Sequence, residues 1–169
     1  MDDATRQALR ELLAAQDVAA LATLHERREG DEPAVSMVPV AWLPDPACTA
    51  DTAAVPQALI HISALAAHTR DLQRTPRAGL MLMAPRRPGD DPQALPRLTL
   101  QADAAPIDPG SAAYDAARTA YLDRFSHAGQ TFALGDFALW RLTPRSARFV
   151  AGFGRAHAVP VALLHACLG

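Results

Sequence analysis

Short segments with strand periodicity recur along this chain, and they constrain its fold more than any other feature of the sequence. Strands are predicted at residues 17–25, 33–42, 58–62, 77–84, 97–105, 136–142 and 147–153. Most of them follow one another through hairpin-type turns, and no strand–helix–strand unit opens with a glycine-rich turn, which argues against a Rossmann domain. The pattern predicts a mainly β (α+β) fold, namely a six- to seven-stranded antiparallel barrel with peripheral helices.

Two of the predicted strands have features that place them in the sheet. In the strand at 33–42, alternation puts Ser36 and Val38 on one face and Met37 on the other. Pro39 lacks an N–H group, which places this strand at a sheet edge or at a bulge. The strand at 77–84 is apolar on both faces, as expected for a central strand that is covered on both sides.

Three helices are predicted beside the strands. In residues 2–16 the apolar positions recur at helical spacing, so we expect an amphipathic N-terminal helix there. Two further helices are predicted at 63–75 and 109–125. The proline-rich segments 44–57 and 85–96 are expected to be loops.

Length and charge bound the class of protein. The chain has 169 residues, enough for one domain with its own core. Its net charge of −2 gives no electrostatic reason to expect nucleic acid or an anionic membrane as a partner. No apolar run approaches the roughly 20 residues that span a bilayer, and the acidic start Met1-Asp2-Asp3 is unlike a signal peptide. We therefore expect a cytoplasmic protein.

All 16 basic residues of the chain are arginine, because lysine is absent. Without lysine no Schiff base can form, which excludes pyridoxal-phosphate enzymes and class I aldolases. A phosphate group would have to be held by arginine, histidine, hydroxyl or backbone N–H groups. The two cysteines, Cys48 and Cys167, show neither metal-ligand spacing nor a disulfide framework.

The segment at 59–72 carries the most informative polar residues. A strand ends, Ser63 follows, and a helix begins with His68, Thr69 and Arg70 in its first turns. Unpaired N–H groups and the helix dipole favour an anion at a helix N-terminus, and an arginine can add a charge-assisted contact. The turn is therefore a candidate phosphate site. The alternative is that Ser63 only caps the helix and that Arg70 is a solvated surface charge.

Several segments together carry a family resemblance. They are AALATL at 19–24, AVSMVP at 34–39, SALAAHTRDL at 63–72, RLTL at 97–100 and GDFALWRLTPRSARFVAGFGR at 135–155. In order and separation they resemble the haem-utilisation (HugZ-type) branch of the pyridoxamine 5'-phosphate oxidase-like flavoproteins, over most of residues 10–157. The resemblance implies a split β-barrel that forms a homodimer and binds FMN in a groove at the subunit interface.

The same resemblance implies which residues bind FMN. The second strand approaches the flavin, the turn at 63–70 cradles the phosphate, and the strand at 97–105 and the GFGR motif supply further contacts. The residues implied are Ser36, Val38, Ser63, His68, Thr69, Arg70, Arg97, Thr99 and Arg155. Alternatives stay open for three of them: Ser36 as a small residue packed inside the barrel, Arg97 as a strand-end arginine in solvent, and Arg155 as a surface arginine at a tight turn.

The C-terminal segment departs from the family pattern. LLHACLG at 163–169 lacks the arginine-containing end with which true pyridoxamine-phosphate oxidases bind substrate phosphate, so biosynthetic vitamin B6 oxidation is not expected. The extra C-terminal domain of the larger haem-degrading relatives is not expected either. We expect residues 1–157 to form the FMN-binding split-barrel domain, including its N-terminal helix, and 158–169 to form a C-terminal tail.

One main hypothesis and two alternatives follow. The main hypothesis is an FMN-dependent oxidoreductase of unknown substrate, in which the flavin does the electron chemistry and no catalytic acid or base is predicted. The first alternative is haem binding or haem degradation on the same barrel, with His157 or His165 reaching the metal. The second is a flavin-free binding or regulatory scaffold. No protein metal site is predicted, because the histidines are scattered without carboxylate support.

Overall fold

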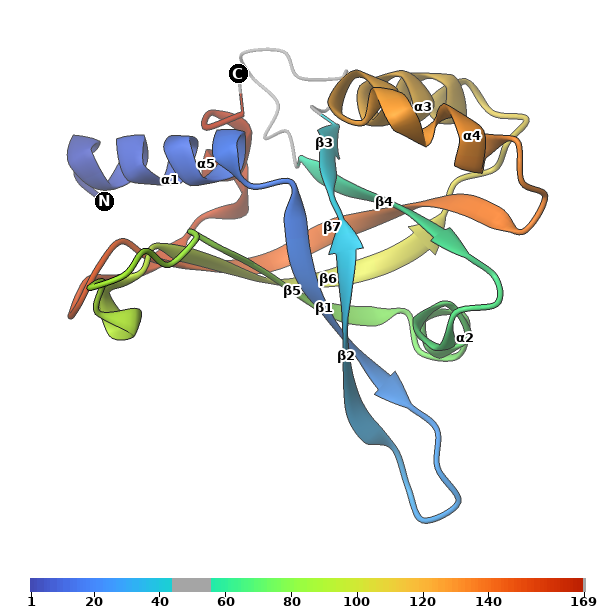
Figure 1. Cartoon of the computed structure of the whole chain (residues 1–169), viewed down its shortest axis with the longest axis horizontal. Helices are drawn as coiled ribbons and strands as arrows, with labels where there is room; N and C mark the ends of the chain where they lie inside the picture. Colours follow the sequence, from blue (N-terminus) through green and yellow to red (C-terminus); the bar gives the residue numbers. More distant parts are fainter. Residues whose placement is uncertain (44–55, 169) are drawn as a thin grey trace.

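The computed structural model describes residues 1–43 and 56–168 (Figure 1). In this part of the chain eight strands form one antiparallel sheet. They are β1 (Val18–His25), β2 (Glu32–Pro39), β3 (Ala41–Leu43), β4 (Gln57–Ser63), β5 (Arg77–Met83), β6 (Arg97–Pro106), β7 (Phe137–Val150) and β8 (Ala156–Val159). The mainly β barrel architecture is confirmed, with eight strands where six or seven were predicted.

The described residues also form five α-helices, which pack at the ends and on one side of the sheet. They are α1 (Asp3–Ala15), α2 (Ala67–Arg74), α3 (Ala112–Arg124), α4 (Gly129–Phe132) and α5 (Val161–His165), and 3-10 helices occur at Pro92–Ala94 and Ser126–Ala128. The predicted N-terminal helix is confirmed. The loop predicted at 44–57 lies outside the described residues except for its last two positions. None of the described helices has the length and apolar character needed to cross a bilayer.

The chain passes from one end of the sheet to the other at Pro39. The strand order is β2-β1-β5-β6-β7-β4-β3, so β2 and β3 are neighbours in sequence but lie at opposite ends of the sheet. Pro39 ends β2, the N–H of Val40 donates to the Asp17 carbonyl at 2.8 Å, and β3 then pairs with β4. The single strand predicted at 33–42 is therefore two strands, and this break brings the ends of the sheet together as a barrel. The predicted edge position of the proline-containing strand is confirmed.

One long strand replaces the two predicted near the C-terminus. β7 continues through the predicted gap and pairs with β6. Gln101 pairs with Ser146 whereas Ala102 pairs with Pro144, so Arg145 is the extra residue of a bulge. A bulge tolerates Pro144 because its missing N–H does not interrupt a regular ladder there.

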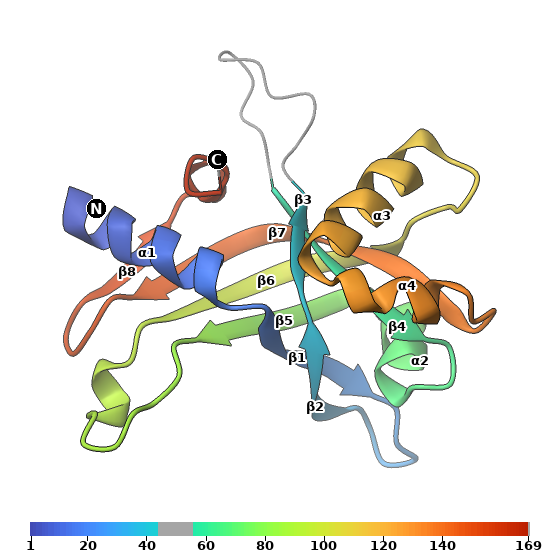
Figure 2. The same ribbon diagram turned by 45° about the horizontal axis from the view of Figure 1, so that its top comes forward.

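The barrel interior is filled by apolar side chains from every long strand. Those inside that are at most 1% exposed include Leu21, Leu80, Leu98, Leu100 and Phe149. α1 packs on this core through its apolar stripe, at the end of the barrel opposite α3 and α4 (Figure 2). A second cluster, centred on Leu59, Tyr121 and Leu139, joins α3 to the outer face of β4 and β7.

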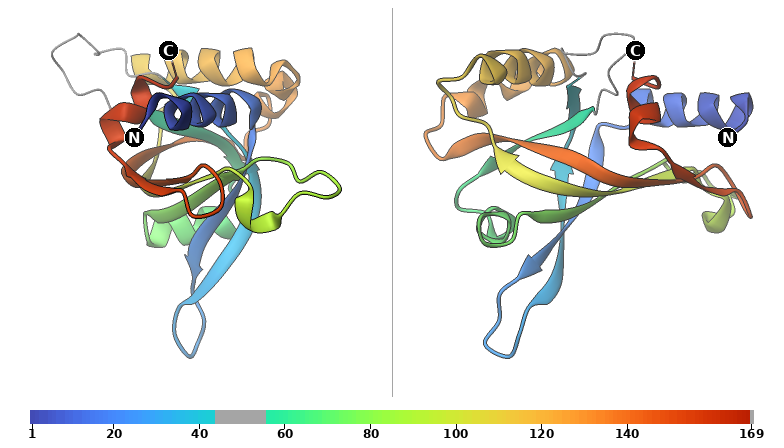
Figure 3. Two further views of the ribbon diagram at one scale, coloured as in Figure 1. Left: turned by 90° about the vertical axis from the view of Figure 1, so that its left-hand side faces the viewer. Right: turned by 180° about the vertical axis from the view of Figure 1, so that it is seen from behind.

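The segment predicted as a C-terminal tail is part of the packed structure. β8 pairs with β7, and α5 lies beside α1 in both views of Figure 3. Val159, Leu164 and Cys167 are buried in the core. Their burial holds residues 156–168 against the barrel.

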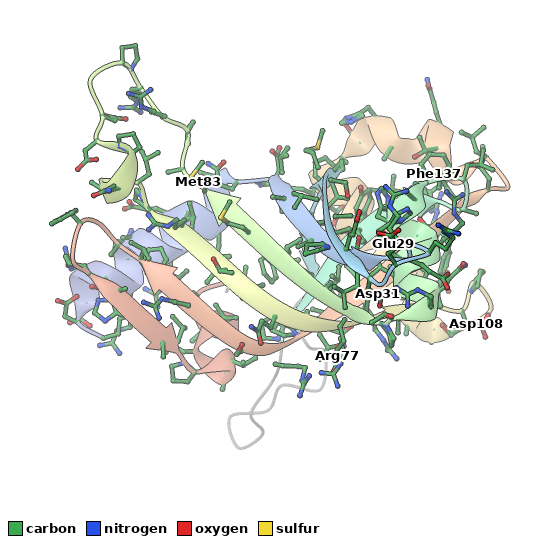
Figure 4. All side chains as sticks on the ribbon, turned by 90° about the horizontal axis from the view of Figure 1, so that it is seen from below. Glu29, Asp31, Arg77, Met83, Asp108 and Phe137 are labelled. Carbon is green, nitrogen blue, oxygen red and sulfur yellow. The ribbon has the colours of Figure 1, made fainter. Side chains whose placement is uncertain are left out.

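One face of the sheet carries no helix in the described part of the chain. Figure 4 shows it from below: β5, β6 and β7 cross the view without a helix in front, and Met83 is labelled at the end of β5. The prediction that both faces of β5 are covered is wrong, because Met81 and Met83 are 37% and 43% exposed. We call this surface the open face and define it by Val18, Val35, Met37, Met81, Met83, Arg97, Thr99 and Arg148.

Candidate functional site

The apolar half of the open face lies on β2, β1 and β5. Ala20 of β1 pairs with Met37 on one side and with Met81 on the other, so the three side chains form one row across the sheet. A cavity of about 470 Å³ lies along this row, and Val35 and Met83 also line it. Methionine side chains are flexible and polarizable, so this surface can adapt to a flat apolar ligand or to another apolar surface.

Positive charge gathers on the neighbouring strands. Met83 pairs with Arg97, and Thr99 pairs with Arg148 on β7. A second cavity, of about 410 Å³, is lined by three arginines, Arg97, Arg148 and Arg155. None of the described residues that line it is acidic. This half of the open face therefore attracts an anion.

The three arginines differ in the hydrogen bonds and ion pairs that they make within the chain. Arg97 donates to two carbonyl groups of the preceding loop, at 3.1 and 3.3 Å. Arg155 reaches α1, where it donates to Thr5 Oγ1 at 2.8 Å and lies 3.7 Å from an Asp2 carboxylate oxygen. Arg148 makes no hydrogen bond or ion pair with a described residue. It is therefore the arginine most available to a ligand.

The turn between β7 and β8 holds an aromatic ring at this cavity. The N–H of Arg155 donates to the Gly152 carbonyl at 3.0 Å, and Gly154 has a φ of +71°, a conformation that favours glycine. Phe153, between the two glycines, is 71% exposed and lines the cavity. An exposed ring beside arginines suits a ligand that is planar and anionic.

The predicted phosphate turn, between β4 and α2, is held together by its own hydroxyl groups. Ser63 Oγ donates to Asp136 Oδ2 at 2.5 Å and accepts from the Leu65 N–H at 3.1 Å. Thr69 is 2% exposed, and its Oγ1 donates to the Ser63 carbonyl at 2.7 Å. Because both hydroxyls already have partners, their observed contribution is to shape the turn.

The N-terminus of α2 keeps other groups that can hold an anion. The helix begins at Ala67, four residues later than predicted, and its N-cap residue, Ala66, makes no side-chain capping bond. Arg70 is exposed and donates to the Leu65 carbonyl at 3.2 Å. Burial lowers the pKa of His68, and the charge of Asp71 opposes this effect. The turn therefore offers backbone N–H groups and Arg70 beside a histidine that tends to be neutral.

The two β2 residues predicted to approach the flavin lie on the inner side of their strand. Val38 is 1% exposed and belongs to the barrel core. Ser36 is half-buried, pairs with Leu21, and its Oγ has no hydrogen-bond partner among the described residues. Their neighbour Met37 faces the opposite side, on the open face.

The structure thus divides the predicted site residues into three groups. Arg97, Thr99 and Arg155 line one cavity. The turn at 63–70 holds the four residues predicted for the phosphate, and the β2 pair forms the third group.

Sequence reasoning missed that Arg148 and the exposed methionines line the two open-face cavities. Arg148 lies in the quoted family segment, but only the strand register places it beside Thr99. The methionines occupy alternate positions of apolar strands, a signal that does not distinguish a covered face from an uncovered one.

Two histidines were named as candidate haem ligands. The structure describes the side chain of one of them, His157, and it does not lie on the open face. His157 pairs with the core residue Phe149, on the opposite face of the sheet, and its Nε2 is buried without a partner among the described residues. The side chain of His165 lies outside the described part of the structure. No group of three or more His, Cys, Asp or Glu in the described residues could hold a metal ion.

Comparison with known proteins identifies the family to which this chain is similar. The model of the pyridoxamine 5'-phosphate oxidase family matches residues 5–151. The chloroplastic non-canonical heme oxygenase HOZ of Arabidopsis thaliana is 34% identical over 136 residues, which make up 80% of this chain and 37% of that protein.

Solved structures give the same result. The heme binding protein from Mycobacterium smegmatis has a TM-score of 0.76 and 28% identity, covering 98% of this chain and 62% of its own. HutZ, the heme storage protein from Vibrio cholerae, has a TM-score of 0.71 and 25% identity, covering 88% of this chain and 95% of its own. The chain spans less than two thirds of the length of the Arabidopsis and Mycobacterium relatives.

Proposed function

The chain belongs to the pyridoxamine 5'-phosphate oxidase family of split-barrel proteins, in its haem-utilisation branch, and from this premise we propose that it binds haem on its open face. The observation that carries the proposal is the pairing of Met83 with Arg97, where the methionine-lined cavity meets the arginine-lined one. Haem has the same division, with an apolar macrocycle and two carboxylate groups on one edge. The relatives reported above are named for heme, which supports this ligand.

Each half of the open face has a part in holding the ligand. Arg148 and Arg97 would bind the carboxylates through charge-assisted hydrogen bonds. Met37, Met81 and Met83 would pack against the macrocycle. When bound, haem supplies the redox and oxygen chemistry, whereas these side chains bind and orient it.

A second copy of the chain would complete the site. The open face exposes the apolar side chains of Val18, Val35, Met37, Met81 and Met83 on adjacent strands. Contiguous apolar surface of this kind is typical of an interaction site. A flat ligand on one open face would leave its other side in water, and a second open face would cover it. We therefore propose a homodimer with opposed open faces.

FMN is the second candidate ligand, and the β4–α2 turn favours it. FMN also combines a planar ring with an anionic group, and the uncapped N-terminus of α2 with Arg70 suits a phosphate. An FMN-dependent oxidoreductase is therefore the second proposal. Haem ranks first because the named relatives of 25% identity and above are heme proteins.

Titration of the purified protein tests the two ligands side by side. Haemin is added in steps while the Soret band is followed, and FMN is added to a second sample that is then gel-filtered. We expect a saturable Soret shift and no stoichiometric retention of flavin. Retained flavin together with an unshifted Soret band would reject haem binding and favour the flavoprotein.

A further inference from the structure

A third cavity lies outside β4, beneath α3 and α4, and it differs in charge from the arginine-lined cavity of the open face. Its volume is about 360 Å³. Tyr121, Phe125 and Phe137 form aromatic walls, and His127 and Gln130 are at the exposed rim. None of the described residues that line it is Asp, Glu or Arg, whereas three arginines line the cavity on β6 and β7. The nearest arginine in the described contacts, Arg118, lies over the Phe132 ring, 5.2 Å from its centroid, and does not line the cavity.

His61 is the polar side chain built into this cavity. It is 7% exposed. The Phe132 ring stacks on it, with a centroid distance of 3.9 Å and an interplanar angle of 12°. The Tyr121 ring packs edge-on against the imidazole with a centroid distance of 5.8 Å, and the Phe137 ring is tilted against it with a centroid distance of 5.2 Å. This packing holds the orientation of the imidazole ring.

The hydrogen bonds of Thr131 assign the proton on this ring. Thr131 Oγ1 donates its only proton to the Ala128 carbonyl at 2.8 Å, so it accepts from His61 Nδ1 at 3.2 Å. The proton of the neutral ring is therefore on Nδ1, and Nε2 is a hydrogen-bond acceptor. The hydrogen bond to Thr131 uses Nδ1, and the hydrogen bonds among the described residues include none to Nε2. Burial lowers the pKa of His61 to about 4, so the ring is neutral at physiological pH.

We propose that this cavity, which we call the His61 pocket, binds a small uncharged aromatic molecule that donates an N–H or O–H group to His61 Nε2. The aromatic walls match a planar ring, and the lack of charged lining residues selects against phosphates and carboxylates. The volume is at the small end of the range of about 300–1,000 Å³ for ligand sites, which suits one or two fused rings. The proposal is independent of haem binding on the open face.

Indole and N-methylindole are the pair of ligands that tests the proposal, because they differ in the single N–H donor. Binding to the purified full chain is measured by calorimetry, with and without haemin. We expect indole to bind about fivefold more tightly than N-methylindole, since one net hydrogen bond contributes about 1 kcal/mol. The His61→Phe variant should lose this preference, and the matched control His25→Phe should keep it. Thermal unfolding checks that both variants are folded.

Three outcomes would overturn the proposal: no binding of indole at millimolar concentration, equal binding of the two indoles to the wild-type chain, or displacement of indole by haemin. The ¹⁵N resonance of His61 Nε2 in the wild-type chain tests the proposed hydrogen bond even if His61→Phe does not fold. It should shift on adding indole to the wild-type chain and stay in place with N-methylindole. Failure of haemin to bind would leave these expectations unchanged, so the two proposals are tested separately.

Discussion

Nδ1 of His25, the last residue of β1, lies 2.8 Å from Oδ1 of Asp71 on α2. The other oxygen of this carboxylate accepts a hydrogen bond from Thr23 Oγ1, also at 2.8 Å. Asp71 is only 3% exposed. Two residues of β1 therefore bind one buried carboxylate, and these contacts tie α2 to the base of the β1–β2 hairpin. Burial alone would raise the pKa of Asp71, but the hydrogen bonds from Thr23 and His25 and the charges of His25 and Arg74 together lower it below 3.8.

Asp71→Asn should lower the free energy of unfolding at neutral pH by about 1–3 kcal/mol, because a buried, hydrogen-bonded charge is removed. A lowered carboxyl pKa contributes stability that is complete at neutral pH and is lost as the pH falls below 3.8. Urea unfolding measured from neutral to acidic pH should therefore show a shallower acid dependence in the variant. The control is Asp103→Asn, because Asp103 is an exposed partner of Arg77. If both variants lose the same stability, Asp71 has no special role.

His61 should make stability depend on pH in a higher range. Its pKa is about 4 in the folded chain and 6.5 in an exposed histidine, so the unfolded state takes up the proton first as the pH falls. Stability is complete above pH 6.5 and should decrease by roughly 3 kcal/mol as the pH falls to about 4. Urea unfolding of His61→Phe should show a flatter profile over this range, whereas His127→Phe, at the exposed rim, should follow the wild type. A His61→Phe profile as steep as that of the wild type would contradict the burial argument.

Met37→Glu should convert the proposed homodimer to monomers. Met37 is 67% exposed at the β2 end of the apolar row, so a carboxylate there costs little in a single chain but would be buried unpaired between two open faces. Sedimentation velocity measures the change. Leu134→Glu is the matched control, because Leu134 is 49% exposed and lies outside the open face. A Met37→Glu dimer as stable as the wild type would place the interface elsewhere.

Arg148→Ala should weaken haemin binding about tenfold, because it removes a charge-assisted hydrogen bond of about 1.5 kcal/mol. The dissociation constant is taken from the Soret titration. Arg27→Ala removes the same charge from the exposed hairpin and should bind haemin as the wild type does. Equal weakening in the two variants would show that net charge matters and that Arg148 makes no direct contact.

Local sequence patterns accounted for much of the fold because they depend on neighbouring residues. The alternation correctly placed Ser36 and Val38 on one face of β2 and Met37 on the other, and Pro39 correctly marked a sheet edge. The apolar stripe of residues 2–16 correctly predicted α1, which spans Asp3–Ala15. These features follow from backbone geometry and from the missing N–H of proline.

The same patterns could not show which hydrogen bonds join distant segments. Ser63 and Thr69 were predicted to hold a phosphate, but their hydroxyls bond to Asp136 and to the Ser63 carbonyl within the turn. Nothing in the sequence near residue 63 indicates that Asp136 approaches it. His61 also carried no local signal, because its environment is built by residues of α3 and α4.

The sequence by itself determined the barrel class, the N-terminal helix, the family and the absence of lysine from any anion site. Tertiary structure alone decided that β7 is continuous across a bulge, that one face of β5 is uncovered, and that Met83 lies beside Arg97. The physical reason is the distance along the chain over which each kind of interaction acts. Periodicity and turn preferences arise from adjacent residues, whereas strand register and burial are set by the packing of segments far apart in the chain.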